Sequence, residues 1–268
     1  MTTLVVDQPV QQIRATHDRV PMSRLVGVEL RKMFDTRSGF WLMASIVIAA
    51  LVATGAVILF APDGELTYDT FSAAIGFPMT VILPMVAILS VTGEWSQRSG
   101  LTTFTLVPHR GRVIGAKALS SVLVGVVSIP LAFAIGALGN VVGTTIAGTD
   151  LVWNMSLAHA AYIVLANVLG MLVGFMLGVL IRSSAGAIVA YFVLTFVLPT
   201  ILGLLATSQS WFHDLRPWVD IQFAQSGLFV FDQALTAEQW TQIAVTGATW
   251  LVAPLAIGLL LVMRAEVK

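Results

Sequence analysis

The sequence of 268 residues contains no cysteine and few charged residues. Without cysteine the chain can form no disulfide, no thiolate metal site and no thiol nucleophile. Asp, Glu, Lys and Arg make up 10% of the residues, whereas about 25% is typical of a soluble domain. Together with 57% hydrophobic residues and a mean hydropathy of +0.90, this composition indicates an integral membrane protein.

Motifs for catalysis and metal binding are also missing. The four histidines are isolated, and no H-E-x-x-H motif occurs. The stretch GRVIGAK (111–117) does not match a Walker A loop, because its glycines are one residue too close and Ala116 follows the second. Ser183 and Ser184 fall about 35 Å from His159 along one predicted helix, too far to act as nucleophile and base. We therefore predict no catalytic centre, metal or cofactor in this chain.

Six long stretches of the sequence are continuously apolar. Each holds the roughly 20 residues needed to cross about 30 Å of hydrocarbon. Because lipid offers no partner to an exposed backbone amide, each stretch must form a helix, and the lack of alternation excludes a β-barrel. The predicted spans are 40–60, 71–92, 117–139, 160–181, 185–206 and 243–263. The expected fold is thus an all-α integral membrane protein with six transmembrane helices.

The charged residues indicate how these spans are oriented. Thirteen of the fourteen Lys and Arg residues fall on one side of the six spans, and only Arg216 falls on the other side. By the positive-inside rule, both termini are cytoplasmic, and 207–242 forms the longest outer connection, expected to be an interfacial cap. Residues 1–20 lack the apolar core of a signal peptide, so we expect a flexible cytoplasmic tail, followed by a helix at 21–38 and a membrane domain at 39–268.

The middle of every predicted span lacks ionisable residues. This absence argues against a proton relay or a voltage sensor, although sodium coupling through backbone carbonyls stays open. Lys117, at the cytoplasmic start of the third span, is expected to snorkel to the interface.

Small residues and prolines mark the spans instead. Gly170, Gly174 and Gly178 recur every four residues and so share one face of the fourth span, where they allow close approach of another helix. That helix can belong to the same subunit or to a second copy. Several prolines interrupt the predicted spans and are expected to kink them: Pro78, Pro84, Pro130, Pro199 and Pro254.

Residues 21–38, PMSRLVGVELRKMFDTRS, predict an amphipathic helix in the plane of the membrane surface. Its apolar stripe contains Met22, Val26, Leu30, Met33 and Phe34. Glu29 falls beside this stripe. Either a cation docks on it, or it pairs with its neighbour Lys32.

The loop at 93–116, between the second and third spans, concentrates charge. Glu94 and Arg98 have the spacing of a stabilising helix pair, which predicts a short helix from Glu94 to Leu106. Pro108 ends it, and His109, Arg110 and Arg112 are expected in a basic turn. A purely topogenic loop explains the basic residues but not Glu94 and Trp95.

These two segments resemble the permease subunits of type-2 ATP-binding-cassette (ABC) exporters. VELRKMFDTRSGFW is similar to that family's connecting helix, and GEWSQRSGLTTFTLVPHRGRVIGAK is similar to its coupling loop. The resemblance implies that the loop docks on a separate ATPase subunit, which binds ATP and Mg²⁺, with the connecting helix beside it. The matching positions are Glu29, Lys32, Glu94, Trp95, Arg98, Pro108, Arg110 and Lys117. Ser99 and Gly100 depart from the pattern, so the coupling helix is expected to be short or bent.

The resemblance implies a function and a set of partners. The chain is expected to form half of a translocation path in a bacterial plasma membrane, together with a second permease copy or a homologous permease. Two ATPase subunits would drive it, no nucleic acid is involved, and the substrate class would be a drug, an antibiotic or a lipid-like amphipathic molecule. The alternatives are a gradient-driven secondary transporter and a non-transport membrane scaffold or immunity protein.

Overall fold

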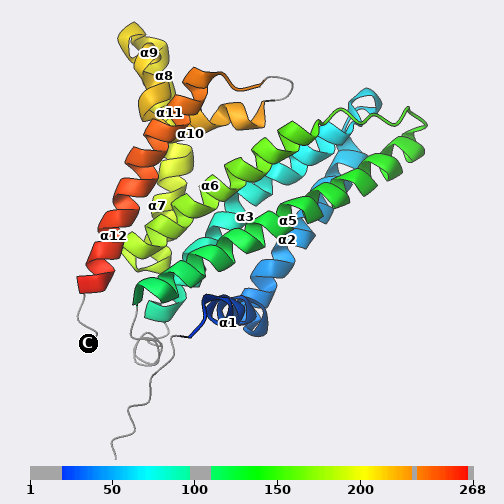
Figure 1. Cartoon of the computed structure of the whole chain (residues 1–268). Helices are drawn as coiled ribbons and strands as arrows, with labels where there is room; N and C mark the ends of the chain where they lie inside the picture. The colour runs from blue at the N-terminus through cyan, green and yellow to red at the C-terminus, as the bar shows by residue number, and fades with distance from the viewer. Residues whose placement is uncertain (1–19, 97–109, 231–233, 265–268) are drawn as a thin grey trace, which may run out of the picture.

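The computed structural model describes residues 20–96, 110–230 and 234–264, and every regular element in them is helical (Figure 1). The α-helices are α1 (Met22–Asp35), α2 (Arg37–Phe60), α3 (Tyr68–Ser96), α5 (Arg110–Ala147), α6 (Leu157–Ile181), α7 (Ser184–Phe192), α8 (Leu198–Ser208), α9 (Ser210–Val219), α10 (Ile221–Ser226), α11 (Ala237–Gly247) and α12 (Ala253–Arg264). Short 3-10 turns occupy Asp63–Glu65 and Gly227–Phe229, and π turns occupy Val193–Val197 and Ala248–Val252.

In the described part of the chain, six continuous helices are long and apolar enough to cross a membrane. Four are α2, α3, α5 and α6, the fifth joins α7 to α8 through a π turn, and the sixth joins α11 to α12 in the same way. The prediction of an all-helical, multi-pass membrane protein is therefore confirmed. α5 has 38 residues, about 57 Å at 1.5 Å per residue, so it is longer than a bilayer core requires.

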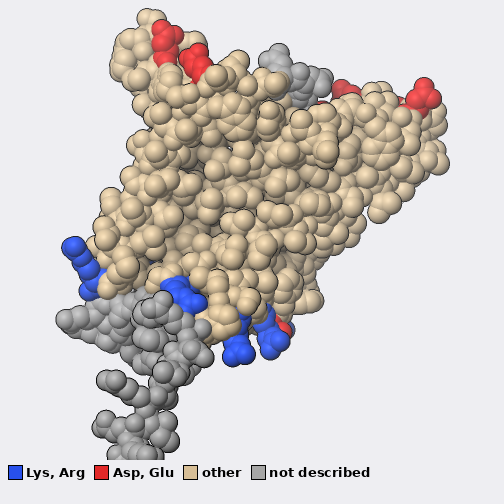
Figure 2. Space-filling view, in the orientation of Figure 1, with Lys and Arg blue, Asp and Glu red and all other residues tan. Residues whose placement is uncertain are grey.

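Charges of opposite sign gather at opposite ends of the molecule. The visible Lys and Arg lie at one end and most of the visible Asp and Glu at the other, with an uncharged belt between them (Figure 2). We call these the basic end, where α1 lies and α5 begins, and the acidic end, where α9 lies and α11 begins (Figure 1).

The helix predicted at 21–38 is α1, which is shorter and turned differently from the prediction. Its buried residues are Val26, Glu29 and Met33, whereas Phe34 is 53% exposed. The predicted apolar stripe is thus buried at Val26 and Met33 but not at Phe34, because α1 packs on α2 and α5 and Glu29 also faces inward. Thr36 separates α1 from α2, where its hydroxyl caps α2 by accepting from the amide of Gly39 at 3.1 Å.

The loop predicted at 93–116 is also shorter in the structure. α3 continues to Ser96, and α5 begins at Arg110, so Arg110 and Arg112 lie in a helix and not in the predicted basic turn. Val113, Ile114 and Ala116 are buried, at spacings that place them on one helical face, and this packing extends the helix. The expected helix from Glu94 to Leu106 falls mostly outside the described residues.

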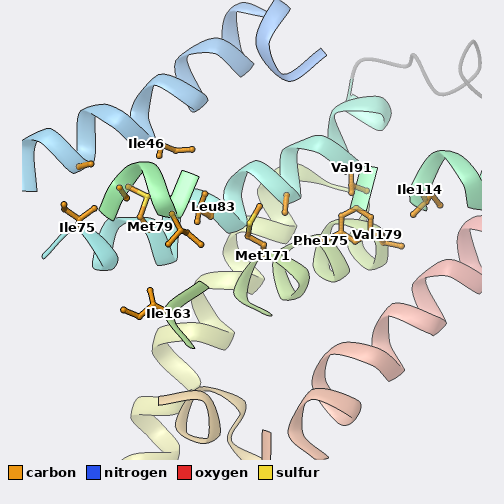
Figure 3. Close-up of a cluster of buried hydrophobic side chains, with 14 of the residues drawn as sticks. Ile46, Ile75, Met79, Leu83, Val91, Ile114, Ile163, Met171, Phe175 and Val179 are labelled. Atoms are coloured by element: carbon orange, nitrogen blue, oxygen red, sulfur yellow. The ribbon is translucent and has the colours of Figure 1, made fainter. Parts of the chain in front are cut away.

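α3 lies at the centre of the bundle, packed against α2, α5 and α6. A large buried cluster runs along these contacts, and Figure 3 shows its members on α3 from Ile75 through Leu83 to Val91, with Met171 and Phe175 of α6 nearer to the Leu83 and Val91 part. This cluster forms the apolar core that positions the remaining elements.

The glycine stripe of α6 faces α3 of the same chain. A Cβ built on Gly174 would come within 2.7 Å of the carbonyl oxygen of Pro84, and one on Gly178 within 3.3 Å of the carbonyl oxygen of Ile88. Gly170 lies beside Pro84 and Tyr191. Of the two partners considered for this stripe, the structure places a helix of the same subunit against it.

Pro84 removes one backbone hydrogen bond from the middle of α3. A proline at 84 has no amide hydrogen to donate to the carbonyl of Thr80, four residues earlier. The hydroxyl of Tyr191, in α7, donates to that carbonyl at 2.7 Å, and the Tyr191 side chain is buried. The fifth span thus satisfies a carbonyl that the second span cannot satisfy by itself.

Candidate interface at the basic end

A buried ion pair joins α1 to α5 at the basic end. Lys117 Nζ lies 2.5 Å from Glu29 Oε2, and Lys32 Nζ lies 2.7 Å from Glu29 Oε1. Glu29 is 6% exposed and Lys117 is 3% exposed. Lys117 also donates to the carbonyl of Ser90 in α3 at 3.0 Å, so this one ammonium group links three helices.

The prediction that Lys117 snorkels to the interface is wrong. Its ammonium group turns inward because the Glu29 carboxylate and the Ser90 carbonyl replace water around it. Both alternatives for Glu29 hold together, since one carboxylate oxygen takes Lys32 and the other takes Lys117. A buried charge without such a partner is strongly destabilising, so the pair constrains where α1 can sit.

Further hydrogen bonds attach α1 along the first turns of α5. Arg112 Nη2 donates to the carbonyl of Val20 at 2.5 Å, just before α1 begins. Ser120 Oγ donates to the carbonyl of Val26 at 3.4 Å. Met33 packs near the other end of α1 in a cluster with Val86 of α3 and Val124 of α5. α1 is therefore fixed at its start, middle and end.

The helix ends around α1 are tied to one another as well. Ser90 and Ser121 hydroxyls lie 3.1 Å apart between α3 and α5. Thr92 and Ser184 hydroxyls lie 2.8 Å apart, which ties the end of α3 to the start of α7. We call the set formed by α1, the end of α3 and the start of α5 the basic-end platform.

The structure brings together only part of the predicted site. Glu29, Lys32 and Lys117 meet in one cluster. Glu94 and Trp95 belong to the last turns of α3, and Arg110 begins α5, so their backbones border the platform. Arg98 and Pro108 lie outside the described residues, as does the middle of the predicted coupling loop.

Sequence reasoning missed several members of the platform. Arg112 was assigned to a basic turn, whereas it sits in the first turn of α5 and binds the chain ahead of α1. The Ser90 carbonyl and the Ser120 hydroxyl carry no sequence signal, because any residue has a carbonyl and serines are common in membrane helices. Lys117 was predicted at the cytoplasmic start of the third span, but neither its burial nor its pairing with Glu29 has a local signature.

Within the described residues, no group of three or more His, Asp or Glu is placed to hold a metal ion. His159 lies in the first turn of α6, and Ser183 and Ser184 follow the opposite end of that helix. What the geometry offers is a rigid, positively charged surface: Arg24, Arg31 and Arg37 are exposed around α1.

Comparison with models of protein families finds no match to this chain, and comparison with curated proteins finds none similar to it.

Proposed function

We propose that this chain is the permease subunit of a type-2 ABC exporter, set in a bacterial plasma membrane with its basic end and both termini in the cytoplasm. The buried Glu29–Lys117 pair carries the proposal, because it joins the segment that resembles a connecting helix to the helix that follows the coupling-like loop. The separation of charge between the two ends supports this orientation.

The positions of the ionisable residues in the spans favour a separate ATPase subunit as the source of energy. Ionisable residues in the six membrane-spanning helices lie near their ends, and the most deeply buried of them, Lys117, is neutralised by Glu29. Such spans hold no charge that an ion gradient can act on. Mechanical force applied at the loop between α3 and α5 would instead move the platform as one body, because hydrogen bonds and the ion pair join its parts.

A second permease is part of the proposal. The fifth span is the one least covered by the rest of the chain, with Val189, Phe192 and Val197 among its exposed side chains. A homologous or identical permease packed near this span would complete a translocation path with apolar walls. Such walls suit drugs, antibiotics or lipid-like amphipathic molecules.

The test is co-purification from native membranes in mild detergent, followed by vanadate-sensitive ATPase measurement in liposomes. We expect an ABC ATPase subunit to co-purify, and the pair Glu94→Ala with Arg98→Ala to lower both its recovery and its activity. The matched control is Asp214→Ala with Glu238→Ala, which removes two charges at the acidic end and should change neither. If the loop variant keeps full recovery and activity, the docking assignment is wrong.

Two measurements separate the alternatives. A gradient-driven transporter would lose transport on addition of an ionophore and keep it when ATP is depleted, whereas the proposed exporter behaves in the opposite way. A scaffold or immunity protein would purify without any ATPase subunit.

A further inference from the structure

The fifth and sixth spans each contain one π turn, and each turn ends two residues before a proline. Val193–Val197 precedes Pro199, and Ala248–Val252 precedes Pro254. A proline ring clashes with the carbonyl four residues earlier, and a widened turn relieves that clash. Wide turns of this kind interrupt regular helical hydrogen bonding, so they are places where a helix can bend.

The part of the fifth span before its π turn is anchored. α7 packs on α6 and α3, with Ala187 and Tyr191 buried. The Tyr191 hydroxyl donates to the Thr80 carbonyl at 2.7 Å, and Ser184 contacts Thr92 at the other end of α7. This half of the span therefore belongs to the central bundle.

The part beyond the π turn packs differently. α8 makes its main contact with α9, which returns alongside it and forms a helical hairpin at the acidic end (Figure 1). Along α8 only Ala206 is buried, whereas Ile201 and Leu204 are 56% and 67% exposed. α8 thus lies outside the core, whereas α9 packs on α11 and has Phe212 buried; we call α8 and α9, residues 198–219, the hairpin.

Arg216 joins this hairpin to the rest of the acidic end. Its Nη2 donates to the carbonyl of Pro199 at 3.3 Å, and its Nε donates to Asp220 Oδ2 at 3.1 Å. Its guanidinium also lies over the ring of Phe223, 4.4 Å from the centroid. Asp220 is 2% exposed and caps α10 through the amides of Gln222 and Phe223.

α10, in contrast to the hairpin, is held by the bundle. Ala224 and the following Leu228 are buried in a cluster with Ala166 of α6. At the end of α9, Trp250 Nε1 donates to the carbonyl of Val219 at 2.8 Å, so the second π turn holds the far end of the hairpin. The hairpin therefore follows the first π turn along the chain and is held by the second through Val219, and Arg216 joins it to Phe223 of α10.

We propose that the hairpin of α8 and α9 is a hinged element that swings about the π turn at Val193–Val197, and that Arg216 is the latch that holds it against α10. This inference does not depend on the ATPase partner. Arginine suits the role because its planar fork contacts a carbonyl, a carboxylate and a ring face at once, which a lysine cannot do.

The absence of cysteine permits a direct test by spin-label distance measurement. One pair of labels, Leu204→Cys with Leu138→Cys, reports the distance from the hairpin to α5. A second pair, Val189→Cys with Val127→Cys, reports the distance from the anchored half of the span to α5. All four side chains are well exposed, between 61% and 67%. In the otherwise unchanged chain, we expect a single distance for each pair.

Arg216→Ala should give the hairpin pair (residues 204 and 138) a second population of distances. The inner pair (residues 189 and 127) should keep a single distance. Arg216→Lys is the conservative variant, which should show the same second population at lower occupancy and guards against a failure of Arg216→Ala to fold. Adding Pro199→Ala to Arg216→Lys removes the cause of the π turn and should suppress the second population. A hairpin pair that stays single in both Arg216 variants overturns the proposal, as does equal broadening of the inner pair, which would mean that the whole span loosens.

Discussion

Replacing Tyr191 with phenylalanine tests whether its hydroxyl substitutes for the amide that Pro84 lacks. The change removes one oxygen, leaves the buried ring in place, and deprives the Thr80 carbonyl of the donor at 2.7 Å. An unsatisfied buried carbonyl costs about 1–3 kcal/mol in protein interiors, whereas interhelical hydrogen bonds in membranes measure about 0.6 and at most about 1.7 kcal/mol. We expect a loss of about 1 kcal/mol of unfolding free energy.

The decisive comparison repeats the substitution in a Pro84→Ala background. Alanine at 84 restores an amide that can donate to the Thr80 carbonyl, so Tyr191→Phe should then cost close to nothing. Pro84→Ala by itself is expected to destabilise, because the proline ring packs against Gly174. The cycle isolates the coupling between the two positions from these single effects.

The assay is reversible unfolding of the purified protein by SDS in detergent micelles, followed by circular dichroism. Tyr68→Phe is the matched control, since it removes a hydroxyl bound to the Phe133 carbonyl at 3.2 Å, far from residue 84 along the chain. Its cost should be the same in both backgrounds. If Tyr191→Phe costs the same with proline and with alanine at 84, the hydroxyl does not replace the missing amide.

Three more predictions concern the platform, the glycine stripe and the orientation. Lys117→Met leaves the Glu29 carboxylate buried without that ammonium group and should lower the unfolding free energy by about 3–5 kcal/mol in the same assay. Adding Glu29→Leu should restore most of this loss. If the free-energy costs of the two substitutions simply add, the buried pair is contradicted. Gly174→Ala forces a methyl group against the backbone of Pro84 and should cost about 1–3 kcal/mol, while Gly55→Ala, with nothing within 4 Å, should be neutral or slightly stabilising. In intact cells, a membrane-impermeant maleimide should label His213→Cys and reach Arg264→Cys only after permeabilisation; the reverse result would invert the proposed orientation.

The helices that depend on local sequence patterns could be predicted from the sequence. Uncharged runs of about 20 residues predict helical spans wherever they occur, because an unpaired backbone amide is too costly in lipid. The amphipathic pattern of Val26, Met33 and their neighbours similarly predicts α1, although its bounds and its buried face shift slightly. The early start of α5 was missed because Arg110 and Arg112 looked like loop residues, and only packing beneath them keeps them helical.

The contacts between distant segments could not be predicted in this way. Glu29 and Lys117 are separated by 88 positions, and no periodicity in either helix announces their pairing. Likewise, the sequence marks the Gly170–Gly178 stripe as a close-packing face without naming the helix that meets it, and it marks Arg216 only as an exception to the charge rule. The partner in each case depends on how several helices cross at once.

The sequence by itself thus determined the membrane class, the number of spans and the opposite charge of the two ends, because each of these follows from hydropathy and charge counted along the chain. The tertiary structure alone decided which buried polar groups satisfy one another: Lys117 with Glu29, Tyr191 with Thr80, and Arg216 with Asp220. In a protein with so few charges, each such pairing constrains the bundle strongly, since a polar group left without a partner in this interior is costly.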